Sequence, residues 1–171
     1  MTTPTYGIKN ATFTACAQQV VQGSPSQVYE VLIDFRRYPA WNTFCYSVEV
    51  PSNVSCAKDV YVGMPMVFHT SGLTPPTNST SNELITYLEL EASPPFVGWR
   101  FDPGLVEGLL LTAEHLSVLR DLGDGTTMYV SWETYYGVGS LALSAILKSN
   151  LQKEFEIQGS DLKARMKALH L

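Results

Sequence analysis

The chain has 171 residues, enough for one domain with a substantial core, and 45% of them are hydrophobic while only 16% are charged. Its formal net charge is −5, and its single adjacent basic pair is Arg36-Arg37. Nucleic-acid surfaces need clustered Lys and Arg, so this composition excludes that class of function.

A strand is predicted first, over Ala11–Gln22, because Thr, Val, Phe and Gln partly alternate there. The next stretch, SPSQVYEVLIDFRRYPAWNTF, is typical of a short helix followed by an aromatic-rich turn. Ser24 can accept a hydrogen bond from the first helical turn, and Pro25 suits the first helical position. Pro39 disfavours helical backbone at Tyr38, so the helix is expected to end before that point.

Short runs of apolar and β-branched residues then predict several strands, each bounded by Pro, Gly or polar residues. These runs are Tyr46–Val50, Met64–Thr70, Glu83–Glu91 and Val97–Phe101. Between the second and third of them lies SGLTPPTNSTS, Ser71–Ser81, which consists of residues that favour turns. We expect this segment to be a mobile loop.

The clearest pattern is a hairpin of Leu111–Asp121 and Thr126–Tyr136, which the turn residues LGDG join. If the turn closes in register, positions whose numbers sum to about 248 face each other. After the hairpin the period changes to that of a helix, over Leu141–Leu171, with Leu, Phe and Met on one stripe. Gly159 lies inside this helix and is expected to mark a bend or a close contact.

This order of elements predicts an α+β fold. We expect a curved antiparallel sheet of about six to seven strands around the long C-terminal helix, with two short helices after the first strand. The whole chain, residues 1–171, is expected to be one domain with its core from about residue 11 onwards. A sheet wrapped around a single helix leaves a space between them, which predicts an internal cavity for a small molecule.

The cysteines and the N-terminal sequence indicate in which cellular compartment the protein is expected. Cys16, Cys45 and Cys56 are odd in number and lack CxxC spacing, so they indicate neither a disulfide framework nor a zinc site. The first residues, MTTPTYGIKN, lack the pattern of a secretion signal, and no apolar run is long enough to span a bilayer. We therefore expect a cytoplasmic protein without stable membrane insertion; the sequence leaves its oligomeric state open.

Three segments of the chain resemble the SRPBCC superfamily, which includes START lipid-transfer domains, birch-allergen-like plant proteins and polyketide cyclase/dehydrase-like proteins. They are the helix and turn VYEVLIDFRRYPAWNTF, the hairpin EHLSVLRDLGDGTTMYVSWETYYG and the closing helix EFEIQGSDLKARMKAL. The resemblance runs from about Ala11 to Leu171 and implies the helix-grip fold of that superfamily. Its members differ widely in function, so the resemblance defines the fold more narrowly than the activity.

The resemblance and the cavity together suggest a function. We expect the protein to bind a hydrophobic small molecule and to catalyse a cofactor-free cyclisation or isomerisation in secondary metabolism. A non-enzymatic carrier of lipids or metabolites is the alternative, with Ser71–Ser81 as a mobile mouth. A co-chaperone-type interaction domain is a third possibility, which the low charge content disfavours.

His115 and Glu133 are the expected catalytic pair. The register of the hairpin would make them cross-strand neighbours, with Cβ atoms roughly 5 Å apart. A hydrogen bond between the imidazole and the carboxylate would raise the pKa of His115 and suit it to proton transfer. A purely structural pair, or one on the solvent face, is the competing interpretation, because an error of one residue in register reverses the face.

The remaining binding candidates depend on which strand faces point inward. Of Leu111–Asp121 we expect the less charged face inward, which carries His115; the partner strand is ambiguous. Tyr129 and Tyr135, if inward, would orient a carbonyl or phenolic ligand. Either Trp99 or Arg100 faces the cavity, and an inward Arg100 would pair with Glu133 or bind an anionic ligand group. The other ligand-binding candidates are Trp41, which is favoured as a plug at one end of the core, and Phe68, Leu151 and Phe155.

Metal and cofactor sites are not expected. His69, His115 and His170 lie far apart in the sequence and have no carboxylate cluster around them. The sequence also lacks a glycine-rich phosphate loop and a dinucleotide fingerprint, so action without a cofactor is the expectation.

Overall fold

The computed structural model describes residues 1–102 and 111–170. Within these residues the chain forms seven strands, two α-helices and two short 3-10 helices. The elements are, in chain order, β1 (Ala11–Gln22), α1 (Pro25–Ile33), η1 (Phe35–Ala40), β2 (Cys45–Glu49), η2 (Ala57–Asp59), β3 (Pro65–Thr74), β4 (Thr77–Glu89), β5 (Phe96–Phe101), β6 (Thr112–Asp121), β7 (Thr126–Tyr136) and α2 (Gly139–Leu169).

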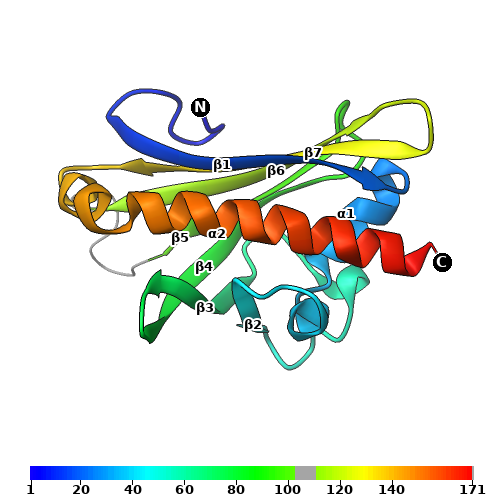
Figure 1. Ribbon diagram of the computed structural model, residues 1–171, viewed down its shortest axis with the longest axis horizontal. Helices are drawn as coiled ribbons and strands as arrows, with labels where there is room; N and C mark the ends of the chain where they lie inside the picture. Colours follow the sequence, from blue (N-terminus) through cyan, green and yellow to red (C-terminus); the bar gives the residue numbers. More distant parts are fainter. Residues whose placement is uncertain (103–110, 171) are drawn as a thin grey trace.

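The strands of the described residues form one antiparallel sheet in the order β1-β7-β6-β5-β4-β3-β2. The first strand pairs with the last, and every other neighbour in the sheet is also a neighbour in sequence. The sheet curls around α2, which runs along its concave side and contacts β1, β3 and β7 (Figure 1). The predicted α+β helix-grip architecture, with short helices after the first strand, is therefore confirmed.

The first helix begins where the sequence predicts. Ser24 Oγ accepts a hydrogen bond from the Gln27 N–H at 3.4 Å, and Gln27 Oε1 accepts one from the Ser24 N–H at 2.8 Å, which forms a capping box. After α1 the chain continues in η1, whose Phe35 and Tyr38 are buried together with Trp41. These rings fill the end of the core beneath α1, so the space under that end of the sheet is occupied.

The predicted loop at Ser71–Ser81 is wrong, because this segment forms most of a hairpin. β3 continues to Thr74, β4 begins at Thr77, and two prolines lie between them. The Thr and Ser side chains that suggested turns contact each other instead, as Thr74 Oγ1 and Thr77 Oγ1 do at 3.1 Å. Thr is β-branched and suits a strand as well as a turn, which the turn interpretation overlooked. A register shift between Thr70 and Thr74 marks a bulge in β3.

The β6–β7 hairpin closes in the predicted register. Asp121 Oδ1 accepts a hydrogen bond from the Gly123 N–H at 2.8 Å, and Gly123 and Gly125 have φ angles of 79° and 81°. Residues with a side chain rarely adopt such positive φ, so the two glycines fix this turn. As a result His115 lies directly opposite Glu133.

The long helix α2 approaches the sheet closely at Gly159. A Cβ atom at this position would lie 3.1 Å from Gln19 Cγ, a side-chain atom of β1. Gly159 therefore marks a close contact between helix and sheet, which is one of the two explanations that the sequence offered.

The first ten residues lie against the outer face of the sheet, which the sequence did not predict. Thr5 donates to the buried Glu114 carboxylate twice, from its N–H at 3.1 Å and from Oγ1 at 2.5 Å. Thr3 Oγ1 contacts Tyr136 Oη at 2.8 Å. In Figure 1 this segment, in dark blue, lies over β1. It shields Glu114 from water and supplies the hydrogen bonds that a buried carboxylate needs.

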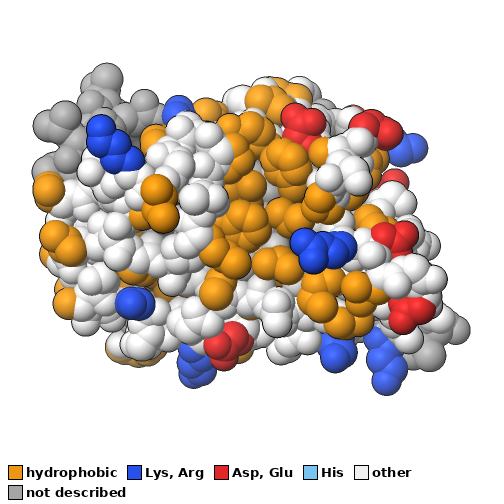
Figure 2. Space-filling view, turned by 90° about the horizontal axis from the view of Figure 1, so that it is seen from above, with side chains coloured by type: hydrophobic (Ala, Val, Ile, Leu, Met, Phe, Trp, Pro, Cys, Tyr) orange, Lys and Arg blue, Asp and Glu red, His pale blue; other side chains and the backbone are white. Residues whose placement is uncertain are grey.

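The surface agrees with the sparse charge of the sequence. On the face drawn in Figure 2, Lys and Arg side chains of the described residues are scattered among hydrophobic and uncharged ones. None of the helices that the structure describes is long and apolar enough to cross a membrane.

Candidate functional site

The candidate site is a cavity of about 290 Å³ between the concave face of the sheet and α2. Strands β2 to β7 and α2 all contribute side chains to it. Most of the lining is apolar or aromatic, as in Phe44, Phe68, Trp99, Leu151 and Phe155. Such a cavity favours an apolar ligand because binding removes apolar surface from water on both sides.

Strand alternation brings polar side chains into this apolar space. On β6 the inward face carries Ala113 and His115, as the sequence predicts. On β7, where the sequence left the face open, Glu133 and Tyr135 line the cavity. The paired register of β6 and β7 therefore places a histidine, a glutamate and a tyrosine on one wall.

His115 is a neutral side chain in this structure. Its ring stacks on Trp99, with centroids 4.1 Å apart and planes 5° apart, and its Nε2 lies 3.1 Å from Ser117 Oγ and 3.3 Å from Ser131 Oγ. These serines, not Glu133, are the hydrogen-bond partners found for the ring among the described residues. The expected rise in the pKa of His115 is wrong: burial lowers this pKa to about 3.

Glu133 is the group that titrates near neutral pH. Burial raises the pKa of its carboxyl to about 7, because the charged form loses its hydration. The Tyr135 hydroxyl donates to Glu133 Oε2 at 2.7 Å and acts in the opposite direction, since it stabilises the carboxylate. Burial has the larger effect, so the carboxyl exists in both protonation states near pH 7.

A second carboxyl, that of Glu83 on β4, lines the same cavity. Glu83 is 6% exposed, and its Oε2 has no hydrogen-bond partner. Burial raises the pKa of Glu83 well above its ordinary value, and the negative charge of Glu133 raises it further. A hydrogen bond from Ser81 lowers it only in part. The two carboxyls therefore influence each other and titrate as a pair.

Glu83 is not among the site residues predicted from the sequence, although the sequence contains a signal for it. Glu83 begins the alternating run Glu83–Glu91, for which the sequence predicts only a strand. In that alternation, however, Glu83 shares its face with Ile85, which is buried in the core. Side chains two positions apart on a strand point to the same face of the sheet. Because the side chain of Ile85 points inward, that of Glu83 is expected to point inward as well.

The structure places the other predicted binding residues in three settings. Phe68, Leu151 and Phe155 line the cavity. Trp41 and Tyr129 are buried in the core cluster and are not among the lining residues that the structure describes. Of the two β5 candidates, Trp99 lines the cavity and Arg100 does not; Arg100 lies opposite Glu114 in the sheet.

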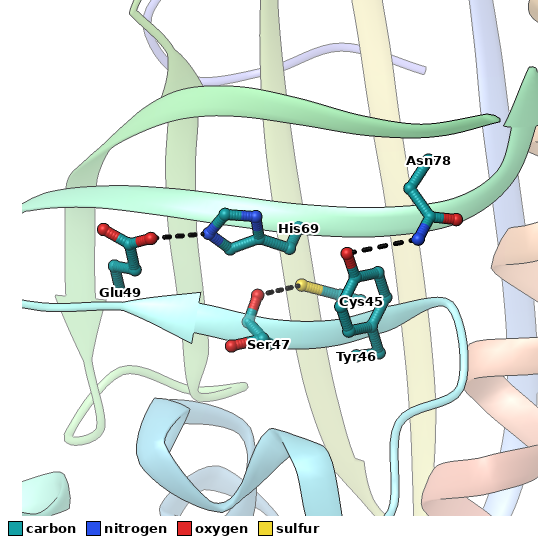
Figure 3. A network of polar contacts seen from close by, with 6 residues as sticks. All are labelled: Cys45, Tyr46, Ser47, Glu49, His69 and Asn78. Carbon is teal, nitrogen blue, oxygen red and sulfur yellow. Dashed lines mark hydrogen bonds and ion pairs between the residues drawn. The ribbon is translucent and has the colours of Figure 1, made fainter.

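His69 contacts the neighbouring strand. Its Nε2 lies 2.8 Å from Glu49 Oε1 on β2, as Figure 3 shows. Cys45 on β2 lines the cavity, and its thiol donates weakly to the Ser47 carbonyl at 3.7 Å. Burial raises the pKa of Cys45 and keeps the thiol neutral. Within residues 1–102 and 111–170, no group of three His, Cys, Asp or Glu side chains is arranged to hold a metal ion.

Comparisons with known proteins agree with this geometry. Residues 21–156 match the family described as "Polyketide cyclase / dehydrase and lipid transport". A comparison with curated protein sequences found no match. Among solved structures, a similar chain is the Zhui aromatase/cyclase from Streptomyces sp. R1128, with a TM-score of 0.71 at 10% identity over 93% of this chain and 96% of that one.

Two further similar structures come from different kinds of organism. Major latex-like protein 151 from Panax ginseng has a TM-score of 0.64 at 11% identity, over 90% of this chain and 97% of that one. A START superfamily protein from Mycobacterium smegmatis has a TM-score of 0.61 at 13% identity, over 91% and 98%. At such identities the similarity shows a shared fold and leaves the activity open.

The raised pKa of Glu133 predicts how stability depends on pH. A carboxyl that binds its proton more tightly in the folded state favours folding at low pH, and this contribution is lost as the pH rises from about 4.5 to about 7. Relative to Glu133→Gln, the wild type should therefore lose up to about 3 kcal/mol of unfolding free energy between pH 5 and pH 8. Urea unfolding at several pH values measures this difference.

The comparison with a variant is needed because His115 acts in the opposite direction. Its lowered pKa costs stability as the pH falls through the ordinary histidine range, and this effect is common to both proteins. Glu91→Gln, which removes an exposed carboxyl, is the control. A difference between wild type and Glu133→Gln that stays constant with pH would contradict the raised pKa.

Proposed function

Because the chain belongs to the family of polyketide cyclases/dehydrases and lipid-transport proteins, we propose that it binds a hydrophobic small molecule in the cavity under α2. The cavity itself is the observation that carries this proposal. Its volume of about 290 Å³ lies at the lower end of the range of small-molecule sites, and its lining is mostly apolar. A ligand with one or two fused rings fits these dimensions.

We further propose that the bound molecule undergoes a cofactor-free isomerisation or cyclisation. As a carboxylate, Glu133 would take a proton from a carbon next to a carbonyl group of the ligand; as an acid, it would return that proton to another atom of the same molecule. A pKa of about 7 makes both forms accessible near neutral pH. No electron acceptor is needed, because the substrate and product are isomers.

The neighbours of Glu133 support this role. The Tyr135 hydroxyl, 2.7 Å from Glu133 Oε2, orients the carboxyl. His115 contributes as a neutral ring that stacks on Trp99 and lines the cavity, so its role is to position the ligand and not to carry charge. The cavity also holds the reacting molecule in one conformation, which can lower the barrier to ring closure by several kcal/mol.

Filling the cavity tests the binding proposal. N-phenyl-1-naphthylamine, a neutral fluorescent probe, should bind wild-type protein saturably with enhanced emission. Ala113 is 1% exposed and lines the cavity, so Ala113→Leu should reduce the affinity about tenfold or more by occupying ligand space. Ala142→Leu, the same change at an exposed position of α2, should leave it unchanged. Absence of saturable binding, or equal binding by Ala113→Leu, would refute the proposal.

Proton exchange tests the catalytic proposal. In deuterated water, wild-type protein should accelerate exchange of the protons next to the carbonyl of 2-naphthylacetone, followed by mass spectrometry. Glu133→Gln should slow this exchange about a hundredfold, because it removes the proton acceptor but keeps the shape of the side chain. Glu91→Gln should retain the wild-type rate. If the wild type does not exceed the buffer rate, the carrier alternative remains; if Glu133→Gln matches the wild type, Glu133 is not the base.

A further inference from the structure

We infer that the ligand of this cavity carries a protonated amine, which Glu83 binds through its open carboxyl oxygen. The inference rests on the proposed function, since it names the chemical class of the molecule bound in the same cavity. It assigns Glu83 to ligand binding and leaves Glu133 to proton transfer.

The hydrogen-bonding groups of the lining favour a ligand that donates. Several donors are already used within the protein: the Tyr38 hydroxyl donates to the Leu32 carbonyl at 2.7 Å, and the Thr70 hydroxyl to the Ser79 carbonyl at 3.4 Å. The Tyr135 hydroxyl likewise donates to Glu133. In contrast, Glu83 Oε2 is buried and has no partner.

A buried acceptor without a donor is costly, so a ligand that supplies an N–H group gains from this position. Glu83 Oε2 is such an acceptor, and its side chain is more than nine-tenths buried.

The charges around the pair favour a cation in particular. The charged groups that shift the pKa of Glu83 are Glu133 and Asp102, and both are acidic. Among the described residues that line the cavity there is no Lys or Arg. Two carboxyls in an apolar space without a counter-charge repel each other and remain partly protonated. An ammonium group supplies that counter-charge and permits both carboxyls to ionise.

The same arrangement disfavours anionic ligands. A carboxylate or phosphate end group would bring a third negative charge next to Glu83 and Glu133, in a mostly apolar space where charges are weakly screened. The cavity therefore selects an apolar amine over a fatty acid or a phosphorylated molecule of the same shape.

A matched ligand series tests this selection. Four compounds share one naphthalene skeleton and differ in the end group: 2-(naphthalen-2-yl)ethylamine, the corresponding alcohol, naphthylacetate and 2-naphthylacetone. Titration calorimetry at pH 7 should show the amine binding wild-type protein about tenfold or more tightly than each of the others. Glu83→Gln keeps the size of the side chain and should reduce amine affinity about tenfold or more, with the alcohol changed by less than about threefold. Glu91→Gln is the charge-matched control and should retain the preference.

The outcomes separate this inference from the proposed function. If naphthylacetate or the ketone binds wild-type protein as tightly as the amine, the inference is overturned while cavity binding stands. If Glu83→Gln retains the full preference for the amine, Glu83 is not its partner and the inference is likewise overturned. If none of the four compounds binds, and N-phenyl-1-naphthylamine does not bind either, the proposed function itself fails.

Discussion

Ionisable side chains are buried in the cavity between the sheet and α2. This burial is the constraint on which the rest of the site depends. At one end of the sheet, Phe35, Tyr38 and Trp41 pack together in the core. Towards the other end the same sheet and helix enclose about 290 Å³. Polar side chains that face this space lose their hydration, and their protonation states follow from that loss.

Burial shifts the pKa values of the two kinds of titratable group in the cavity wall in opposite directions. It favours the neutral form of each, so it lowers the pKa of His115 and raises the pKa values of Glu133 and Glu83. The imidazole stacks on Trp99 and has little capacity to carry charge, whereas a carboxyl can be an acid or a base near pH 7. The two groups of the wall whose pKa values are raised and coupled are therefore Glu83 and Glu133, whereas the catalytic role expected for His115 and Glu133 stays a prediction.

Local signals in the sequence predicted the fold and one wall of the site. The LGDG turn needs two glycines with positive φ, and this fixes the register that sets His115 opposite Glu133. Other features depended on tertiary contacts that no local pattern contains. The Ser71–Ser81 segment contains turn residues, yet its threonines pair across β3 and β4. The alternation with Ile85 implied an inward Glu83, but the cavity that Glu83 shares with Glu133 exists only in the folded sheet. The neutral state of His115 follows from its burial among side chains of other elements, such as Trp99 of β5, so the sequence did not reveal it.

The most direct measurement is an NMR titration of the glutamate side-chain carboxyl carbons in ligand-free protein, with Glu133→Gln and Glu83→Gln to assign the two cavity signals. Because burial without a counter-charge controls both groups, the signal of Glu133 should titrate near pH 7 and that of Glu83 well above the ordinary glutamate range. If every glutamate signal titrates near the ordinary value of about 4.3, the carboxyls are hydrated, and the account of two desolvated carboxyls with Glu133 as the proton-transferring group is contradicted.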